Sequence, residues 1–149
     1  MDYFEIHGLK TLNGVIEVSG AKNAVLPLMA ASILNQGKLK ISNVPTLSDS
    51  VTMSKLLKKM GAKVNFESDN SISVDSSKLD NPFAPYDLVK TMRASFYVLG
   101  PLLARFGNAK VSLPGGCAWG PRPVDFHLDG LKALGCLLYT SPSPRDPKS

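Results

Sequence analysis

Two segments carry the residue types that bind anions. In the first, Lys22 and Asn23 follow Gly20, where an alternating apolar and polar stretch gives way to a wholly apolar one. A strand that turns into a helix presents backbone N–H groups and the positive end of the helix dipole to an anion. The spacing of a Walker A loop is absent, so this junction is not a nucleotide P-loop. A solvated lysine in a tight turn is the alternative interpretation.

The second basic segment contains Lys90 and Arg93, three residues apart in a stretch with helical spacing. This spacing places both cations on one helix face. A planar guanidinium suits a phosphate or a carboxylate. A solvated basic helix face has the same pattern, so the pair alone does not establish a site.

A third segment has the chemistry of proton transfer. Three glycines and three prolines fall within residues 113–123, a density that indicates a shaped loop. Cys117 lies within it, and Arg122, between two prolines, favours the thiolate form of a nearby cysteine. Because an unused exposed thiol is open to oxidation, we favour a functional loop over a plain linker. Asp125 and His127 follow in the first turn of the next expected helix, where His127 is a candidate ligand contact.

The elements that must position these residues alternate between strands and helices. Pro27 is expected in the first turn of the first helix, and Pro101 is expected to kink or split the third. We expect strands at 14–19, 38–44, 62–66 and 71–74, helices at 24–34, 48–60 and 88–106, a loop at 75–85, and a last helix from about 125.

An internal repeat links the two halves of the chain. Residues 37–42 resemble 107–112, and residues 57–62 resemble 131–136, at offsets of 70 and 74 residues. The shared order and similar offsets favour a real repeat. The pattern then stops in mid-unit, because the Ser- and Pro-rich ending cannot pair as a hairpin. We expect residues 137–149 to be a non-native, disordered tail, like the translated adapter tails of assembled transcripts. A flexible natural terminus is the alternative.

Composition and charge indicate a globular protein and give no sign of a membrane-spanning or nucleic-acid-binding one. A chain of 149 residues with 44% hydrophobic and 19% charged residues is one domain or part of a larger protein. The net charge of +5 suits anionic substrates, but it is spread along the chain without a nucleic-acid motif. No apolar run approaches a membrane span, and no signal peptide is expected at the N-terminus.

The cysteine content bears on compartment and metals. The two cysteines, Cys117 and Cys136, lack zinc-site spacing and indicate a reducing, cytoplasmic setting. Cys136 directly follows the last expected helix, and we expect it to be a small buried residue.

Residues 19–24, 84–95 and 113–125 together resemble the UDP-N-acetylglucosamine 1-carboxyvinyltransferases, a family of enolpyruvyl transferases. The resemblance runs from Met1 to about Cys136, with three motifs in family order and spacing. It implies an α/β fold of repeated βαβαββ-type units, the inside-out α/β barrel of the enolpyruvyl transferases. That fold is expected to be incomplete here, since residues 1–136 resemble only about the N-terminal third of a family chain.

The resemblance also implies a reaction. The enolpyruvyl group of phosphoenolpyruvate moves to a hydroxyl of UDP-N-acetylglucosamine, and phosphate is released. The reaction proceeds through a tetrahedral intermediate without a metal or organic cofactor, and it opens peptidoglycan synthesis. The expected partners are these two small molecules, with no nucleic acid and no membrane, and the oligomeric state is left open.

Residue roles follow from the resemblance position by position. Lys22 matches the lysine that binds phosphoenolpyruvate, and Asn23 matches a contact to the sugar nucleotide. Arg93 and Arg122 match the arginines that hold phosphate and carboxylate. Cys117 matches the loop cysteine that acts in proton transfer and product release and is alkylated by fosfomycin. The expected lining of the uridine nucleotide is formed by Arg122, Pro123, Val124, Asp125, Phe126 and His127.

The chain also departs from the family pattern. The family's catalytic Asp and a further substrate Arg come from later sequence and have no counterpart here. We therefore expect the 149-residue chain by itself to be inactive and poorly folded. Two other functions stay open: an enolpyruvyl transferase acting on shikimate 3-phosphate, which the cysteine loop disfavours, and a remnant that binds a nucleotide or a protein without catalysis.

Overall fold

The computed structural model describes residues 3–8, 11, 13–113 and 124–139. The chain divides into two units, one spanning residues 1–115 and the other residues 116–149. Within the described ranges, no helix is long and apolar enough to cross a membrane.

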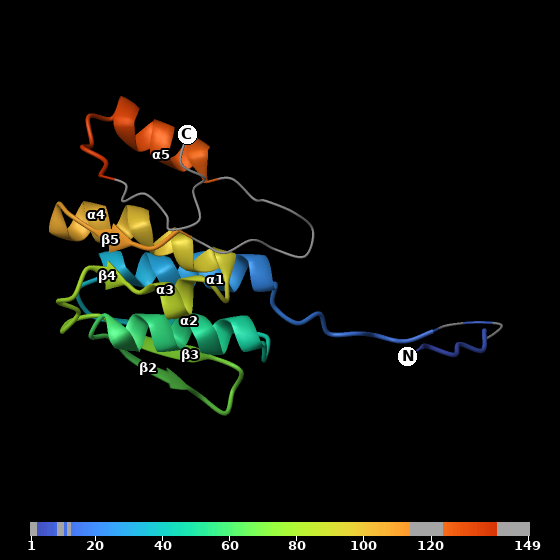
Figure 1. Ribbon diagram of the computed structural model, residues 1–149. Coiled ribbons are helices and arrows are strands. Elements are labelled where there is room, and N and C mark those ends of the chain that lie inside the picture. The colour runs from blue at the N-terminus through green and yellow to red at the C-terminus, as the bar shows by residue number, and fades with distance from the viewer. Residues whose placement is uncertain (1–2, 9–10, 12, 114–123, 140–149) are drawn as a thin grey trace. The chain divides into compact units, whose positions relative to one another are not determined.

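A three-stranded sheet forms one layer of the first unit (Figure 1). Its strands are β1 (Lys38–Ile41), β2 (Lys63–Phe66) and β3 (Ile72–Asp75), in the order β1-β3-β2. β3 is antiparallel to both neighbours. β1 and β2 therefore run parallel to each other, and helix α2 (Ser48–Lys59) links them as the crossover of a split βαβ motif.

The strand register separates an apolar face of the sheet from a polar one. Val74 lies opposite Val64, and both are buried. One residue along, Asp75 lies opposite both Lys38 and Lys63. Because side chains alternate along a strand, one face packs into the core and the other meets water. Hydrogen bonding from Ser77, including its backbone N–H, holds the pKa of the Asp75 carboxyl below its usual value, and the charges of the two lysines add a smaller lowering effect.

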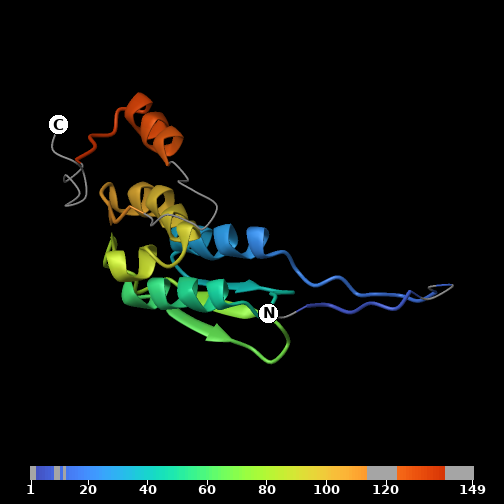
Figure 2. The same ribbon diagram turned by 45° about the vertical axis from the view of Figure 1, so that its right-hand side comes forward.

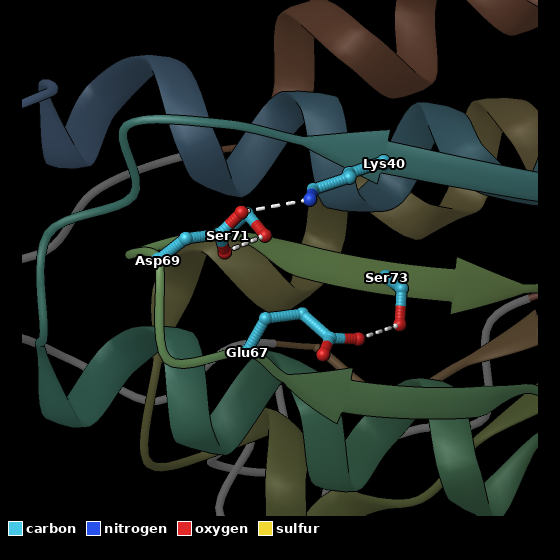
Figure 3. A network of polar contacts seen from close by, with 5 residues as sticks. All are labelled: Lys40, Glu67, Asp69, Ser71 and Ser73. Carbon is cyan, nitrogen blue, oxygen red and sulfur yellow. Dashed lines mark hydrogen bonds and ion pairs between the residues drawn. The ribbon is translucent and has the colours of Figure 1, made fainter.

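The polar face carries an ion-pair network (Figure 3). Lys40 donates to Asp69 at 2.8 Å, and Ser71 donates to the other oxygen of Asp69. Glu67 accepts a hydrogen bond from Ser73 at 2.8 Å. The hydrogen bonds from Lys40 and Ser71 lower the pKa of Asp69, so the stabilisation they supply is lost as the pH falls through that lowered pKa. The contribution is small, because these groups are exposed.

Helices α1 (Lys22–Ala31) and α2 cover the apolar face of the sheet, as Figure 3 shows from the opposite side. The 3₁₀ helix η1 (Ser32–Leu34) continues α1. The 3₁₀ helix η2 (Arg93–Val98) and helix α4 (Leu99–Phe106) pack against α1 and η1. Burial of one such side chain contributes about 1.5–3 kcal/mol. The fully buried core side chains include Met29, Ile33, Met53, Leu56, Leu57, Met60, Ile72, Val74 and Leu102.

Shorter elements complete the described chain. Helix α3 (Tyr86–Val89) precedes η2, and β4 (Phe83–Ala84) pairs in parallel with β5 (Lys110–Val111). In the second unit, helix α5 spans Asp125–Ala133. The expected loop at 75–85 thus ends in a short strand, whereas the predicted hairpin at 62–74 is confirmed as β2 and β3.

The helix ends predicted to repeat close in the same way. The Ala62 N–H donates to the Leu57 carbonyl at 3.0 Å, and the Cys136 N–H donates to the Leu131 carbonyl at 3.0 Å. In each end the preceding glycine has a positive φ, 104° and 87°, as expected for a glycine that ends a helix. The expected burial of Cys136 is wrong: it is partly exposed. Ala62 is buried and leads into β2, whereas no strand follows Cys136 in the described part of the second unit.

The strand predicted at residues 14–19 is wrong. Among the residues described before Gly20, none is in a strand, and Val15, Ile16 and Val18 are 84–96% exposed. A strand is stabilised by the hydrogen-bond ladder to a neighbouring strand. No such neighbour pairs with this segment in the described structure, so its alternating pattern has no sheet to join.

The single helix predicted at residues 88–106 is also wrong. The chain is extended at Met92, with φ −149° and ψ 114°. The Thr91 hydroxyl donates to the Leu88 carbonyl at 2.8 Å, a local bond that competes with helix propagation, and the break buries Met92. Lys90 therefore caps α3 while Arg93 begins η2, and the two cations do not share one helix face.

Two prolines bear on the helix boundaries. α1 begins at Lys22, so Pro27 lies in its second turn rather than its first. Because proline has no N–H, the carbonyl of Asn23, four residues earlier, lacks its usual helical donor. Pro101 was predicted to kink or split the region 88–106. A new helix, α4, begins at Leu99, and Pro101 lies in its first turn, where a missing N–H breaks no bond.

Arg105 joins three separate segments of the first unit. Its guanidinium donates to the carbonyl oxygens of Ile33 at 2.8 Å, Ser76 at 2.9 Å and Leu79 at 3.3 Å. These acceptors lie in η1 and in the segment after β3. One side chain of α4 therefore bonds three backbone carbonyl groups, of which that of Ser76 also accepts the Leu79 N–H.

We expect the substitution Arg105→Met to lower the free energy of unfolding by about 3 kcal/mol, because a hydrogen bond to a charged group contributes about 1.5–3 kcal/mol. Chemical denaturation of the complete protein measures this loss. Arg105→Lys keeps the charge but not the fork of donors, so its free energy of unfolding should lie between those of the unsubstituted protein and Arg105→Met. Lys55→Met, on the exposed face of α2, is the control. Equal effects of the Arg105→Met and Lys55→Met substitutions would contradict the prediction.

Candidate functional site

Helices α1 and α2 begin side by side at the same end of the helical layer (Figures 1 and 2). Lys22 is the first residue of α1, and Asp49 is the second residue of α2. Their side chains form an ion pair, with 2.5 Å between Lys22 Nζ and Asp49 Oδ2. The predicted Lys22 junction is therefore built from two helix starts rather than one.

Neither helix start is capped by a side chain in the described structure. The N-cap residues are Ala21 for α1 and Leu47 for α2, and neither makes a side-chain cap hydrogen bond. Uncapped first-turn N–H groups are available to a ligand or water. Two parallel helices also bring the positive ends of their dipoles together, which favours an anion at this end.

Lys22 occupies an electrostatically unfavourable position. A cation in the first turn of a helix opposes the dipole by about 0.3–1 kcal/mol, whereas an anion there is favoured by a similar amount. Asp49 is therefore stabilised by its own helix, and Lys22 is destabilised by its own. The side chains of Lys22 and Asp49 are 53% and 27% exposed, so the carboxylate is the more enclosed partner and the ammonium remains open to solvent.

A close backbone approach holds the start of α1 in place. The Gly20 N–H donates to Asn43 Oδ1 at 3.0 Å. Asn43 has a φ of 54°, in the left-handed region that asparagine tolerates. A Cβ on Gly20 would lie only 1.8 Å from the Asn43 carbonyl oxygen. Only glycine therefore fits at this turn.

The structure places two other predicted site residues in the first unit. Asn23 is the second residue of α1 and is exposed next to Lys22. Arg93 is exposed at the first position of η2, which packs against α1. Helix α1, which begins with Lys22, and η2, which begins with Arg93, are thus neighbours.

The remaining predicted site residues lie elsewhere in the chain. Cys117, Arg122 and Pro123 fall outside the described residues. In the second unit, Val124 is the N-cap residue of α5, and its first turn contains Asp125, Phe126 and His127. This confirms the first-turn positions expected for Asp125 and His127, and Phe126 is 87% exposed.

The sequence analysis missed two residues that the structure places in the candidate site. Asp49 was expected only as part of a helix start, and Asn43 was assigned no role. Both lie more than 20 residues from Gly20 and Lys22, and no local spacing links such distant positions. Within the described part of the chain, no group of three or more His, Cys, Asp or Glu side chains is placed to hold a metal ion.

A comparison with protein families identifies one match along most of the chain. The family model described as EPSP synthase (3-phosphoshikimate 1-carboxyvinyltransferase) matches residues 6–141. This range includes all three segments that carry the candidate residues.

Relatives and a solved structure agree with this match. A protein of Dichelobacter nodosus is 58% identical over 91% of this chain and 32% of its own length, and one of Coxiella burnetii is 57% identical over 91% and 31%. Both are named UDP-N-acetylglucosamine 1-carboxyvinyltransferase. The crystal structure of the enolpyruvyl transferase NikO from Streptomyces tendae superposes with a TM-score of 0.60, at 30% identity, over 70% of this chain and 24% of that one. The chain spans about a third of the length of the curated relatives that it matches.

We expect Gly20→Ala to displace the start of α1, because the added Cβ would overlap the Asn43 carbonyl oxygen. Overpacking of this kind costs about 1–3 kcal/mol. A lower melting temperature and faster hydrogen exchange in the first turn of α1 would report the displacement. Gly14→Ala is the matched control, since its Cβ would meet no atom within 4 Å. A Gly20→Ala variant as stable as Gly14→Ala would contradict the prediction.

Proposed function

The chain belongs to the EPSP synthase family, and from that premise we propose that it is the N-terminal part of a UDP-N-acetylglucosamine 1-carboxyvinyltransferase. The observation that carries the proposal is the identity of 51–58% to relatives of that name over more than nine tenths of the chain. The fold supports it, because the NikO neighbour is also an enolpyruvyl transferase.

The proposed reaction exchanges one C–O bond for another. A hydroxyl oxygen of UDP-N-acetylglucosamine attacks C2 of phosphoenolpyruvate while a proton adds to C3, which gives a tetrahedral intermediate. Loss of phosphate from C2 and of a proton from C3 restores the vinyl group. Phosphoenolpyruvate has a phosphate and a carboxylate, so the site must provide fixed cations and N–H donors for both groups.

The first unit supplies part of this machinery in the proposal. Lys22 binds phosphoenolpyruvate beside the uncapped starts of α1 and α2, where the helix dipoles favour an anion. Asn23 contacts the sugar nucleotide, and Arg93 provides a guanidinium for phosphate or carboxylate. The exposure of all three side chains supports these roles.

The later segments supply proton transfer and nucleotide binding in the proposal. Cys117 acts in proton transfer and product release, and fosfomycin alkylates it. Arg122 is the second anion-binding arginine. The exposed first turn of α5 supports its assignment to the nucleotide. The segment proposed to line the nucleotide comprises Arg122, Pro123, Val124, Asp125, Phe126 and His127.

A second candidate function comes from the family description, which names 3-phosphoshikimate 1-carboxyvinyltransferase. The names of the curated relatives favour UDP-N-acetylglucosamine as the acceptor.

In the proposal the complete enzyme acts in the cytoplasm, where it takes part in cell-wall synthesis and thus in cell division. Residues 1–136 are its N-terminal part, and residues 137–149 are not native to it.

The gene is expected to continue past codon 136 into strand-forming sequence and a long remaining segment. The helix end at Gly135 supports this expectation, since the equivalent end at Gly61 leads directly into β2. Sequencing the gene, or its full-length transcript, across this codon is the measurement. An encoded Ser- and Pro-rich ending followed by a stop codon would contradict the proposal.

The complete protein is expected to release phosphate from phosphoenolpyruvate only when UDP-N-acetylglucosamine is present. The 149-residue chain alone is expected to release none, because it spans about a third of the relatives' length. A coupled phosphate assay measures both, and mass spectrometry identifies the enolpyruvyl product.

Two controls separate the candidate functions. Turnover with shikimate 3-phosphate in place of UDP-N-acetylglucosamine would establish the second candidate and overturn the first. Fosfomycin should add its mass to the complete protein and to a Cys136→Ser variant, but not to Cys117→Ser. If the complete protein shows a cooperative melt but no turnover with either acceptor, the non-catalytic binding function is the better one.

A further inference from the structure

The Lys22–Asp49 pair differs from the other ion pairs that lysines form in the described chain. Lys90–Asp87 and Lys132–Asp129 each join residues three apart on one helix, and Lys40–Asp69 lies on the solvent face of the sheet. Lys22–Asp49 instead joins the first turns of two helices that pack together. Asp49 also has the least exposed side chain, at 27%, of the residues in these described pairs.

The helix dipoles determine which partner is fixed. The start of α2 favours the Asp49 carboxylate, and the start of α1 repels the Lys22 ammonium. Without Asp49, the long and flexible lysine side chain would turn away from two positive helix ends into water. The carboxylate is therefore the anchored group, and it determines where the ammonium points.

A second contact makes this arrangement more than a surface ion pair. The segment between β1 and α2 supplies Asn43, whose Oδ1 accepts a hydrogen bond from the Gly20 N–H. The first turn of α2 then supplies Asp49. The turn at Asn43 is itself held by a hydrogen bond from the Val44 N–H to the Asn70 carbonyl at 2.7 Å. The segment that leads from β1 into α2 therefore fixes both the backbone at Gly20 and the ammonium group of Lys22.

We propose that Asp49 is a positioning residue that holds the Lys22 ammonium in place for the phosphate or carboxylate of the substrate; this rests on the proposed function. An ammonium has three N–H donors. Asp49 engages one of them and leaves two for substrate oxygens. The side chain of Lys22 is then ordered before the substrate arrives, which reduces the cost of binding and of reaching the transition state.

Positioning and charge have opposite effects on substrate affinity, and this separates the proposal from a merely structural role. Removal of the Asp49 charge makes the site more positive, which favours an anionic substrate in the ground state. It also releases Lys22, which weakens stabilisation of the transition state. We therefore expect Asp49→Asn in the complete protein to lower kcat about tenfold or more, without a rise in the KM for phosphoenolpyruvate. Asp49→Glu, which keeps the charge, should restore most of kcat.

Amine labelling tests the same contact without turnover. An amine engaged by a carboxylate is less available to an acylating reagent. In the complete protein without substrate, Asp49→Asn should raise the acetylation rate of Lys22 severalfold relative to that of Lys55, an exposed lysine of α2, as measured by peptide mass spectrometry. Asp69→Asn is the matched control: it removes the partner of Lys40 on the solvent face of the sheet, and should change neither Lys22 labelling nor kcat.

The two readouts distinguish the possible failures. Unchanged labelling of Lys22 in Asp49→Asn overturns the positioning role, whatever the activity. A fall in kcat that merely follows a lower melting temperature, and that Asp49→Glu does not rescue, also overturns it. If the unsubstituted complete protein turns over no phosphoenolpyruvate, the proposed function fails, while labelling still decides whether Asp49 holds Lys22.

Discussion

The packing of α1 against α2 on one face of the sheet is the constraint on which the candidate site depends. α2 connects two parallel strands, so its direction is fixed by β1 and β2. Its buried side chains, among them Leu56 and Leu57, join the sheet to the rest of the core. α1 then lies beside α2 with both starts at one end. The positive end of each dipole, and the Lys22–Asp49 pair, are consequences of this packing.

The site also departs from the rules that stabilise helices elsewhere in the chain. Asp49 lies in the first turn of α2, and Lys58 and Lys59 lie in its last turn, as the helix dipole favours. α1 has the opposite arrangement, with Lys22 at its start and an alanine at its N-cap. Such local conflicts are expected where function rather than stability determines the residue. The ion pair to Asp49 offsets part of the conflict.

The sequence predicted much of the fold because many of its elements are governed by local patterns. The alternation in residues 62–74 and the glycine at position 61 were sufficient to predict β2, β3 and the end of α2. The break at Met92 was not predictable, because it depends on burial of that side chain in the core. The strand expected at 14–19 failed for a related reason, since alternation does not say whether a partner strand is present.

The sequence by itself placed Lys22 and Asn23 just before the helix predicted at 24–34, whereas α1 begins at Lys22. It did determine the family through its motifs, the identity of the chemically able residues, and the first-turn position of His127. These follow from residue types and spacings that act over a few positions. Only the tertiary structure decided that Asn43 contacts Gly20, that Asp49 pairs with Lys22, and that three carbonyl groups share Arg105. Those contacts join residues more than 20 positions apart. They form because packed helices and a strand crossover bring distant segments together, and no local pattern records that geometry.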